Sequence, residues 1–233
     1  MADEIDYTIV GDDMQAVVVT LDENEAVRAE AGAMMYMTRG IEMDTGAEGG
    51  IFGGLKRVVS GESFFITNFK CVSQQGQVSF AGPYPGKIIA LDLAETGQML
   101  CQKDAFLCCA AGVDLDIAFT KRLGAGFFGG EGFILQSLQG DGLAFIHAGG
   151  AVVKMSLDPG QDLRVDTGCL VALQASVDYN IKYVGGIKTA LFGGEGLFFA
   201  HLTGPGDVYL QTLPFSRLAD RVASATVQQK NRG

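Results

Sequence analysis

The sequence has few of the residues that build metal sites and nucleophilic active sites. It contains two histidines, five cysteines and no tryptophan in 233 residues, without a C-x-x-C pair or a G-x-S-x-G motif. Zinc needs several histidine or cysteine ligands that converge, and the lone histidines His147 and His201 offer no such set. Cys108 and Cys109 are adjacent in an apolar run, where burial raises the thiol pKa. We therefore expect reduced, buried cysteines, no cofactor and no enzyme activity.

Charge is also sparse, and it is mostly acidic. Charged residues make up 19% of the chain, and its net charge is −10. Sequence-independent binding to nucleic acid or to an anionic membrane depends on lysine and arginine, so both are disfavoured. Apolar residues make up 48%. A surface with so little charge favours burial between subunits and predicts a homo-oligomer.

Targeting and membrane-spanning segments are missing from the pattern. No run of about 18 apolar residues occurs, so no span is expected. The segment MADEIDYTIV carries acids where a signal peptide carries basic residues, and the arginine-rich look of a mitochondrial presequence is absent. We expect a cytoplasmic protein.

The chain does contain internal repeats. FGGEGFILQSLQGDG from Phe128 matches FGGEGLFFAHLTGPG from Phe192, and SGESFFITNF from Ser60 is a weaker copy. Upstream of each copy lies a second matching block, which begins with AGAMMYMTRGIEM, DAFLCCAAGVDLD or TGCLVALQASVDYN. The matches predict N-terminal strands in residues 1–19, repeats over 20–90, 91–155 and 156–218, and a flexible tail over 219–233, all in one compact domain.

Almost every segment has the pattern of a strand. Short stretches rich in β-branched and aromatic residues alternate with Gly, Asp or Pro. Seven stretches are typical: 17–21, 78–80, 88–93, 113–119, 133–138, 152–157 and 208–213. One short helix is expected near residues 216–223, after Pro214, with a frayed polar end beyond it. The fold class is all-β, with three tandem β-sandwich-like repeats and a pseudo-threefold within the chain.

Residues 124–132, GAGFFGGEG, contain the spacing G-x-G-x-x-G. These glycines bind pyrophosphate only where a strand leads in and a helix leads out. Here strand-like segments lie on both sides, and no amphipathic helix follows Gly132. The motif is interpreted as a tight corner rather than a phosphate cradle.

Long ordered strings resemble a known family over nearly the whole chain. They include PGKIIALDL, TKRLGAGFFGGEGFILQSLQGDG, VDTGCLVALQASVDY and GGIKTALFGGEGLFFAHLTGPGDVYLQTLPFSR. They are similar to bacterial members of the altered-inheritance-of-mitochondria-24 family, also called the mitochondrial biogenesis family. The resemblance implies a fold like that of the tryptophan RNA-binding attenuator protein, a short double-stranded β-helix, with three units in one chain and a nine-unit ring in a trimer. It implies no established chemistry.

Two sets of acids recur with the repeats. Glu62, Glu131 and Glu195 follow a glycine in each copy. They are ligand or interface candidates, either as a divalent cation site or as residues that fix a turn or pair with a cation across a protomer boundary. A second set follows a β-branched residue and is expected on solvated strand faces: Glu42, Asp114 and Asp178.

Phe128 and Phe192 stand beside the glycine corners. They either line a ligand cleft between units or belong to the core or a subunit interface. Three hypotheses follow for function. The first is a non-enzymatic homotrimeric scaffold or adaptor with an unknown protein partner, the second is a binder of a small ligand, and the disfavoured third is a metal-dependent enzyme.

Overall fold

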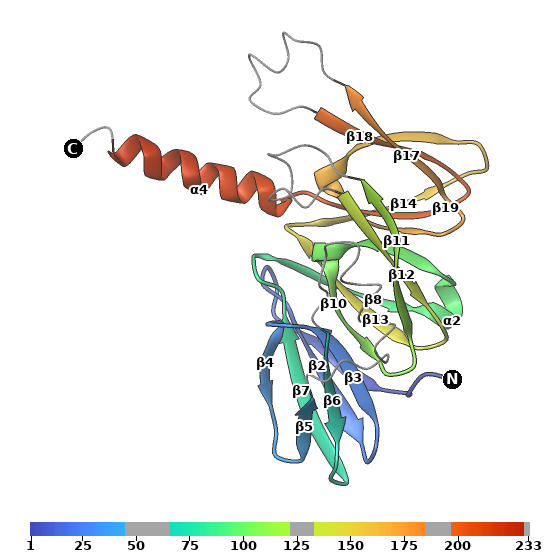
Figure 1. Cartoon of the computed structure of the whole chain (residues 1–233), viewed down its shortest axis with the longest axis vertical. Helices are drawn as coiled ribbons and strands as arrows, with labels where there is room; N and C mark the ends of the chain where they lie inside the picture. Colours follow the sequence, from blue (N-terminus) through green and yellow to red (C-terminus); the bar gives the residue numbers. More distant parts are fainter. Residues whose placement is uncertain (45–65, 122–132, 185–196, 231–233) are drawn as a thin grey trace.

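The computed structural model describes residues 1–44, 66–121, 133–184 and 197–230. These residues form four antiparallel sheets, and the first sheet lies beside β5, β6 and β3 of the second at one end of the long axis (Figure 1). The first sheet has the order β1 (Asp6–Val10), β2 (Ala16–Asp22), β7 (Gln75–Ala81), β4 (Met34–Met37). The fourth has the order β15 (Asp162–Asp166), β18 (Leu197–Thr203), β17 (Asp178–Val184).

The two middle sheets each have six strands. The second has the order β5 (Ile41–Asp44), β6 (Ile66–Cys71), β3 (Ala26–Glu30), β10 (Phe106–Ala110), β13 (Leu143–Gly149), β8 (Gly86–Asp92). The third has the order β11 (Asp114–Lys121), β12 (Phe133–Gln139), β9 (Met99–Gln102), β16 (Leu170–Gln174), β19 (Gly206–Gln211), β14 (Val152–Leu157). The all-β prediction is confirmed, and each of the seven segments expected as strands overlaps one.

The pairing order recurs along the chain. The strands β2, β7 and β4 are neighbours in the first sheet, β8, β13 and β10 in the second, and β14, β19 and β16 in the third. The remaining strands show a second recurrence, as β5–β6–β3, β11–β12–β9 and β17–β18–β15. Two pairings join these groups within a sheet, β3 with β10 and β9 with β16. We call them the β3–β10 seam and the β9–β16 seam.

The core lies between facing sheets, because alternation directs one face of each strand inward. Phe69 and Phe80, from the second and first sheets, meet edge to face with ring centroids 5.3 Å apart. Phe119 and Tyr179 do the same between the third and fourth sheets, at 5.4 Å. Both pairs combine burial with the favourable edge-to-face geometry of aromatic rings.

Helical structure is limited. A four-residue turn, α2 (Leu93–Thr96), and two short 3-10 turns, η1 (Lys103–Ala105) and η3 (Thr167–Cys169), interrupt the strands. The C-terminal helix α4 (Phe215–Lys230) projects away from the sheets (Figure 1). It is longer than the helix expected over 216–223, and the polar residues that follow, expected to be frayed, continue it. The added residues include alanine, glutamine and lysine, which are good helix formers and favour the extension.

The chain context of the G-x-G-x-x-G motif agrees with the corner interpretation. Residues 124–132 lie outside the described part, but β11 precedes them and β12 begins directly after them at Phe133. These two strands are antiparallel neighbours. A strand therefore stands where a dinucleotide-binding loop would need a helix.

Candidate functional site: two open strand edges

Every sheet in the described part of the chain has two edge strands, and for two of these strands both counterparts are paired on both sides: β4 in the first sheet and β15 in the fourth. In the described part of the chain, β4 pairs with β7 alone and β15 pairs with β18 alone. An open strand presents a row of backbone N–H and C=O groups that can pair with another chain. We call these two strands the β4 edge and the β15 edge.

The β4 edge has two counterparts that are paired on both sides. β10 lies between β13 and β3, and β16 lies between β19 and β9. All three strands share a local irregularity in their register: it falls between Met34 and Tyr36, between Phe106 and Cys108, and between Leu170 and Ala172. Because the irregularity aligns the strands residue by residue, Tyr36 corresponds to Cys108 and to Ala172.

Burial separates the β4 edge from its counterparts. Met35, Tyr36 and Met37 are 54%, 39% and 40% exposed. The corresponding side chains of β10 and β16 are at most 2% exposed: Leu107, Cys108, Cys109, Val171, Ala172 and Leu173. The β4 edge therefore displays apolar side chains of a kind that a neighbouring strand covers at both seams.

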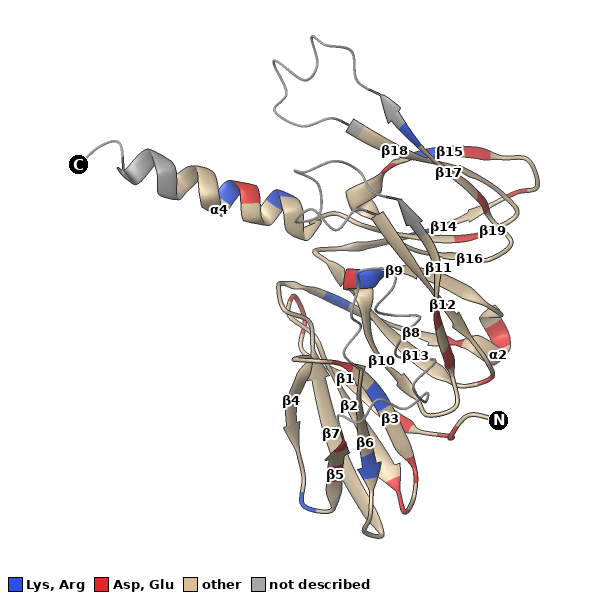
Figure 2. Ribbon diagram, viewed as in Figure 1, with Lys and Arg blue, Asp and Glu red and all other residues tan. Residues whose placement is uncertain are grey.

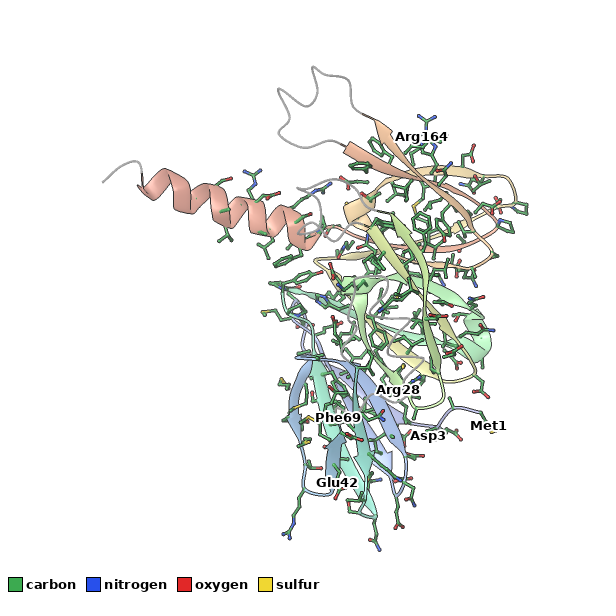
Figure 3. The ribbon with its side chains drawn as sticks, viewed as in Figure 1. Met1, Asp3, Arg28, Glu42, Phe69 and Arg164 are labelled. Atoms are coloured by element: carbon green, nitrogen blue, oxygen red, sulfur yellow. The ribbon has the colours of Figure 1, made fainter. Side chains whose placement is uncertain are left out.

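The β15 edge is also more exposed than its counterparts at one position. Its counterparts β3 and β9 pair with β10 and β16, and Leu100 of β9 is only 5% exposed. At the corresponding position β3 has the half-buried Arg28 and β15 has the exposed Arg164, whose side chain is directed away from the fourth sheet in Figure 3. Leu163 is half-buried. Because Arg28 pairs with Cys109 across the β3–β10 seam, an arginine at this position is compatible with strand pairing.

The end of β15 is also tied to the C-terminal helix. Arg217 of α4 forms an ion pair with Asp166 at 2.8 Å, and the same carboxylate accepts a hydrogen bond from the backbone of Gly168 at 2.9 Å. Both charged side chains are partly exposed. The start of α4 is thus held beside the β15 edge.

Each seam has a polar residue at the end of its first strand. At the β9–β16 seam, Gln102 donates from Nε2 to the carbonyl of Thr167 at 2.6 Å. At the β3–β10 seam the same place is taken by Glu30, whose pKa is raised to about 7. Burial is the main cause and the charge of Asp104 adds to it, while Lys103 opposes both.

The structure leaves the predicted glycine-corner site untested. Glu62, Glu131, Glu195, Phe128 and Phe192 all lie outside the described residues. The second set of acids is described, and each member is exposed as expected: Glu42 in β5, Asp114 in β11 and Asp178 in β17. These three strands belong to different sheets, so they do not form one cation site.

The histidines also lie apart, His147 in β13 and His201 in β18. His147 is buried against the ring of Tyr84, with centroids 4.6 Å apart, and burial lowers its pKa. Among the described residues, no group of three histidine, cysteine or acidic side chains could hold a metal ion.

The thiols are poor nucleophiles. Cys71, Cys101, Cys108 and Cys109 are buried and Cys169 is half-buried, and all five are unpaired. Burial raises the pKa of the Cys109 thiol to about 11, although Arg28 opposes the shift, and it raises the pKa of Cys101 and Cys108 as well. A thiolate is the reactive form, so these groups are inert at neutral pH.

Comparison with known proteins assigns the family. The model of the family described as Mitochondrial biogenesis AIM24 matches residues 7–213. The chain belongs to the AIM24 family. The crystal structure of protein SPYM3_0169 from Streptococcus pyogenes is similar to this AIM24 chain, with a TM-score of 0.79 and 25% identity over 95% of this chain and 100% of that one.

Neither a curated relative of the chain nor, in its described part, a membrane-spanning helix was found. No curated protein matches the chain. In the described part of this AIM24 protein, no helix has the length and apolar character needed to cross a membrane.

Proposed function

We propose that this AIM24 protein is a non-enzymatic scaffold or adaptor of the cytoplasm, and that three copies assemble head to tail through the β4 and β15 edges. The observation that carries the proposal is the exposure of Met35, Tyr36 and Met37, whose counterparts are buried at both seams. Each copy then contributes three successive modules, which extend from β2 to β7, from β8 to β13 and from β14 to β19. A closed ring has nine modules.

The two seams give the register of the proposed contact. In the first seam Cys108 pairs with Ala29, and in the second Ala172 pairs with Cys101. The corresponding contact between copies pairs Tyr36 with Val165. The next two pairs in the same register are Met37 with Arg164 and Thr38 with Leu163.

Flanking hydrogen bonds support this register. The N–H of Ala111 donates to Ala26 at the first seam, and the N–H of Ala175 donates to Gln98 at the second. The corresponding bond runs from Arg39 of one copy to Asp162 of the next. Each end of the chain carries a different edge, so the contact is heterologous and forms a ring only if the rotation closes.

A matched pair of substitutions tests the assembly. Met37→Lys places a cation opposite Arg164, whereas Met43→Lys puts the same charge on a methionine that is 50% exposed in β5. Light scattering after size exclusion should give three times 24.6 kDa for the wild type and for Met43→Lys. Met37→Lys should dissociate. A monomeric wild type, or the same mass for both variants, would overturn the proposal.

Binding of a small ligand is a second candidate, favoured by one observation. The Nδ1 atom of His147 is buried and has no hydrogen-bond partner among the described residues. A ligand that binds only the folded protein raises its melting temperature. A thermal-shift screen with amino acids, nucleotides and divalent ions, repeated on His147→Gln, tests this candidate. A shift that persists in His147→Gln would argue against the histidine as the contact.

A further inference from the structure

The segments that connect successive groups of strands lie side by side. Three backbone contacts order them: Met14 bridges Gly86, Gly150 donates to Pro85 at 3.0 Å, and Leu213 donates to Gly149 at 3.0 Å. The segment around Leu213 is the last of this series. The earlier segments lead into the strands β2, β8 and β14, whereas this one leads into α4, which begins at Phe215.

In the head-to-tail assembly proposed above, the next copy supplies a segment at the same step of this series. Residues 13–15 lead into β2, as residues 85–87 lead into β8. They therefore come to lie beside Leu213 of the preceding copy. The turn between β1 and β2 of one copy therefore lies next to the first turns of α4 of the preceding copy.

Both segments expose apolar side chains. On α4, Phe215 is 55% exposed although its ring lies 5.4 Å from that of Tyr84 in the same chain, and Val222 is 60% exposed. The half-buried Leu218 lies between them on the same face at helical spacing. Beside the β1–β2 turn, Met14 is 67% exposed and Val10 is 41% exposed. Exposed apolar side chains on two segments that meet are a feature of interfaces between protein chains.

The charges of the two segments are opposite. Arg217 and Arg221 are one turn apart on α4, and the helix carries a net positive charge although the whole chain carries −10 (Figure 2). The β1–β2 turn contains Asp12 and Asp13, and the side chain of Asp13 is 98% exposed although its carboxylate lies 3.6 Å from Nζ of Lys87. Opposite charges of this kind favour one orientation of docking.

We propose that α4 clasps the β1–β2 turn of the next copy of this chain. Phe215 packs on Met14 of that copy, and Arg221 pairs with Asp13. The inference rests on the proposed head-to-tail assembly and adds a second contact to it. The helix that projects from one copy in Figure 1 is then covered in the assembly.

Crosslinking separates the clasp from the edge contact. Two full-length chains, Met14→Cys and Phe215→Cys, are co-expressed with different tags and treated with a short bis-maleimide. A second mixture uses Thr38→Cys and Leu163→Cys. Each single variant and the wild type serve as controls for the half-buried Cys169. We expect a crosslinked pair of differently tagged chains in both mixtures and in none of the controls.

The outcomes are distinct. Crosslinking of the Thr38 and Leu163 variants without crosslinking of the Met14 and Phe215 variants overturns the clasp and leaves the assembly intact. If neither mixture crosslinks, the assembly fails and the clasp fails with it. A Met14 product formed by one variant alone would indicate a different, symmetric contact and would also overturn the clasp.

Charge reversal gives a second test that does not depend on cysteines. Asp13→Lys and Arg221→Glu should each weaken the trimer about two- to fivefold, the range measured for exposed ion pairs. The double variant should recover the wild-type dissociation constant. Failure of the recovery removes the ion pair from the proposal. If Arg221→Glu instead abolishes sedimentation with phosphatidylserine vesicles and leaves the trimer unchanged, α4 binds lipid and the clasp is wrong.

Discussion

Gln102 reaches from the end of β9 to the carbonyl oxygen of Thr167, and Glu30 occupies the corresponding place at the end of β3. A glutamine donates this hydrogen bond at any pH. A carboxyl group can donate one only when it carries a proton. Burial raises the pKa of Glu30 to about 7, so we expect the β3–β10 seam to respond to pH near neutrality.

Glu30→Gln should stabilise the protein at pH 8 and have little effect at pH 5. The pKa of Glu30 rises from 4.5 to about 7 on folding, so the folded state holds the proton more tightly. Stability from this group is complete below pH 4.5 and declines as the pH rises through 7. The gain at pH 8 is about 1–2 kcal/mol after allowance for partial exposure.

Urea unfolding at the two pH values measures this effect. The exposed Glu42→Gln in β5 is the control, and it should change stability equally at both. A Glu30→Gln effect that is the same at pH 5 and pH 8 would contradict the assignment.

His147 should give folding stability the opposite dependence on pH from Glu30. Its burial lowers the pKa below 6.5 in the folded state, so the unfolded state takes up the proton more readily. The folded protein therefore loses stability as the pH falls below 6.5. His147→Gln should reduce this acid-dependent loss, and His201→Gln in β18 is the matched control. Unfolding midpoints between pH 7 and pH 5 test the prediction, which fails if both variants follow the wild type.

Gln211 connects two segments by buried hydrogen bonds. Its Nε2 donates to the carbonyl of Gly168 at 2.8 Å, and its Oε1 accepts from the N–H of Gly149 at 2.7 Å. Gln211→Leu leaves both backbone groups without these partners and should cost about 2–4 kcal/mol. The exposed Gln139→Leu in β12 should cost less than about 0.5 kcal/mol. Chemical denaturation compares the two, and equal losses would exclude the hydrogen bonds as the cause.

Thiol reactivity reports on burial in the folded chain. Four cysteines are buried and one, Cys169, is half-buried. A thiol reagent should therefore label no more than one thiol per chain in native buffer and all five in guanidinium chloride. Cys169→Ser should remove the native labelling. Fast native labelling of a second thiol would show that Cys108 or Cys109 is accessible.

The sequence predicted the strands well and the open edges poorly, for a physical reason. Alternation and turn residues are local, and they identify β14, for example, at its observed bounds. The segment MMYM of β4 is as apolar as FLCCA of β10, so composition alone suggests that both are core. Only the pairing order shows that β10 has a second neighbour in the described chain and β4 has one.

The C-terminal helix was underestimated for a similar reason. The spacing of Phe215, Leu218 and Val222 is a helical signal, but the residues after Ala223 are mostly polar and offer no continuous apolar face. Packing usually decides whether such a segment is helical. Good intrinsic propensity continues α4 to Lys230 without it.

The β4 edge has a consequence for how the chain is made. β4 contains no lysine, acid or proline that would discourage a foreign strand. It leaves the ribosome well before β15, its complement in the proposed register, is synthesised. During that interval the nascent polypeptide exposes an unpaired apolar strand that can pair with other chains. Slow translation or overexpression should therefore promote aggregation.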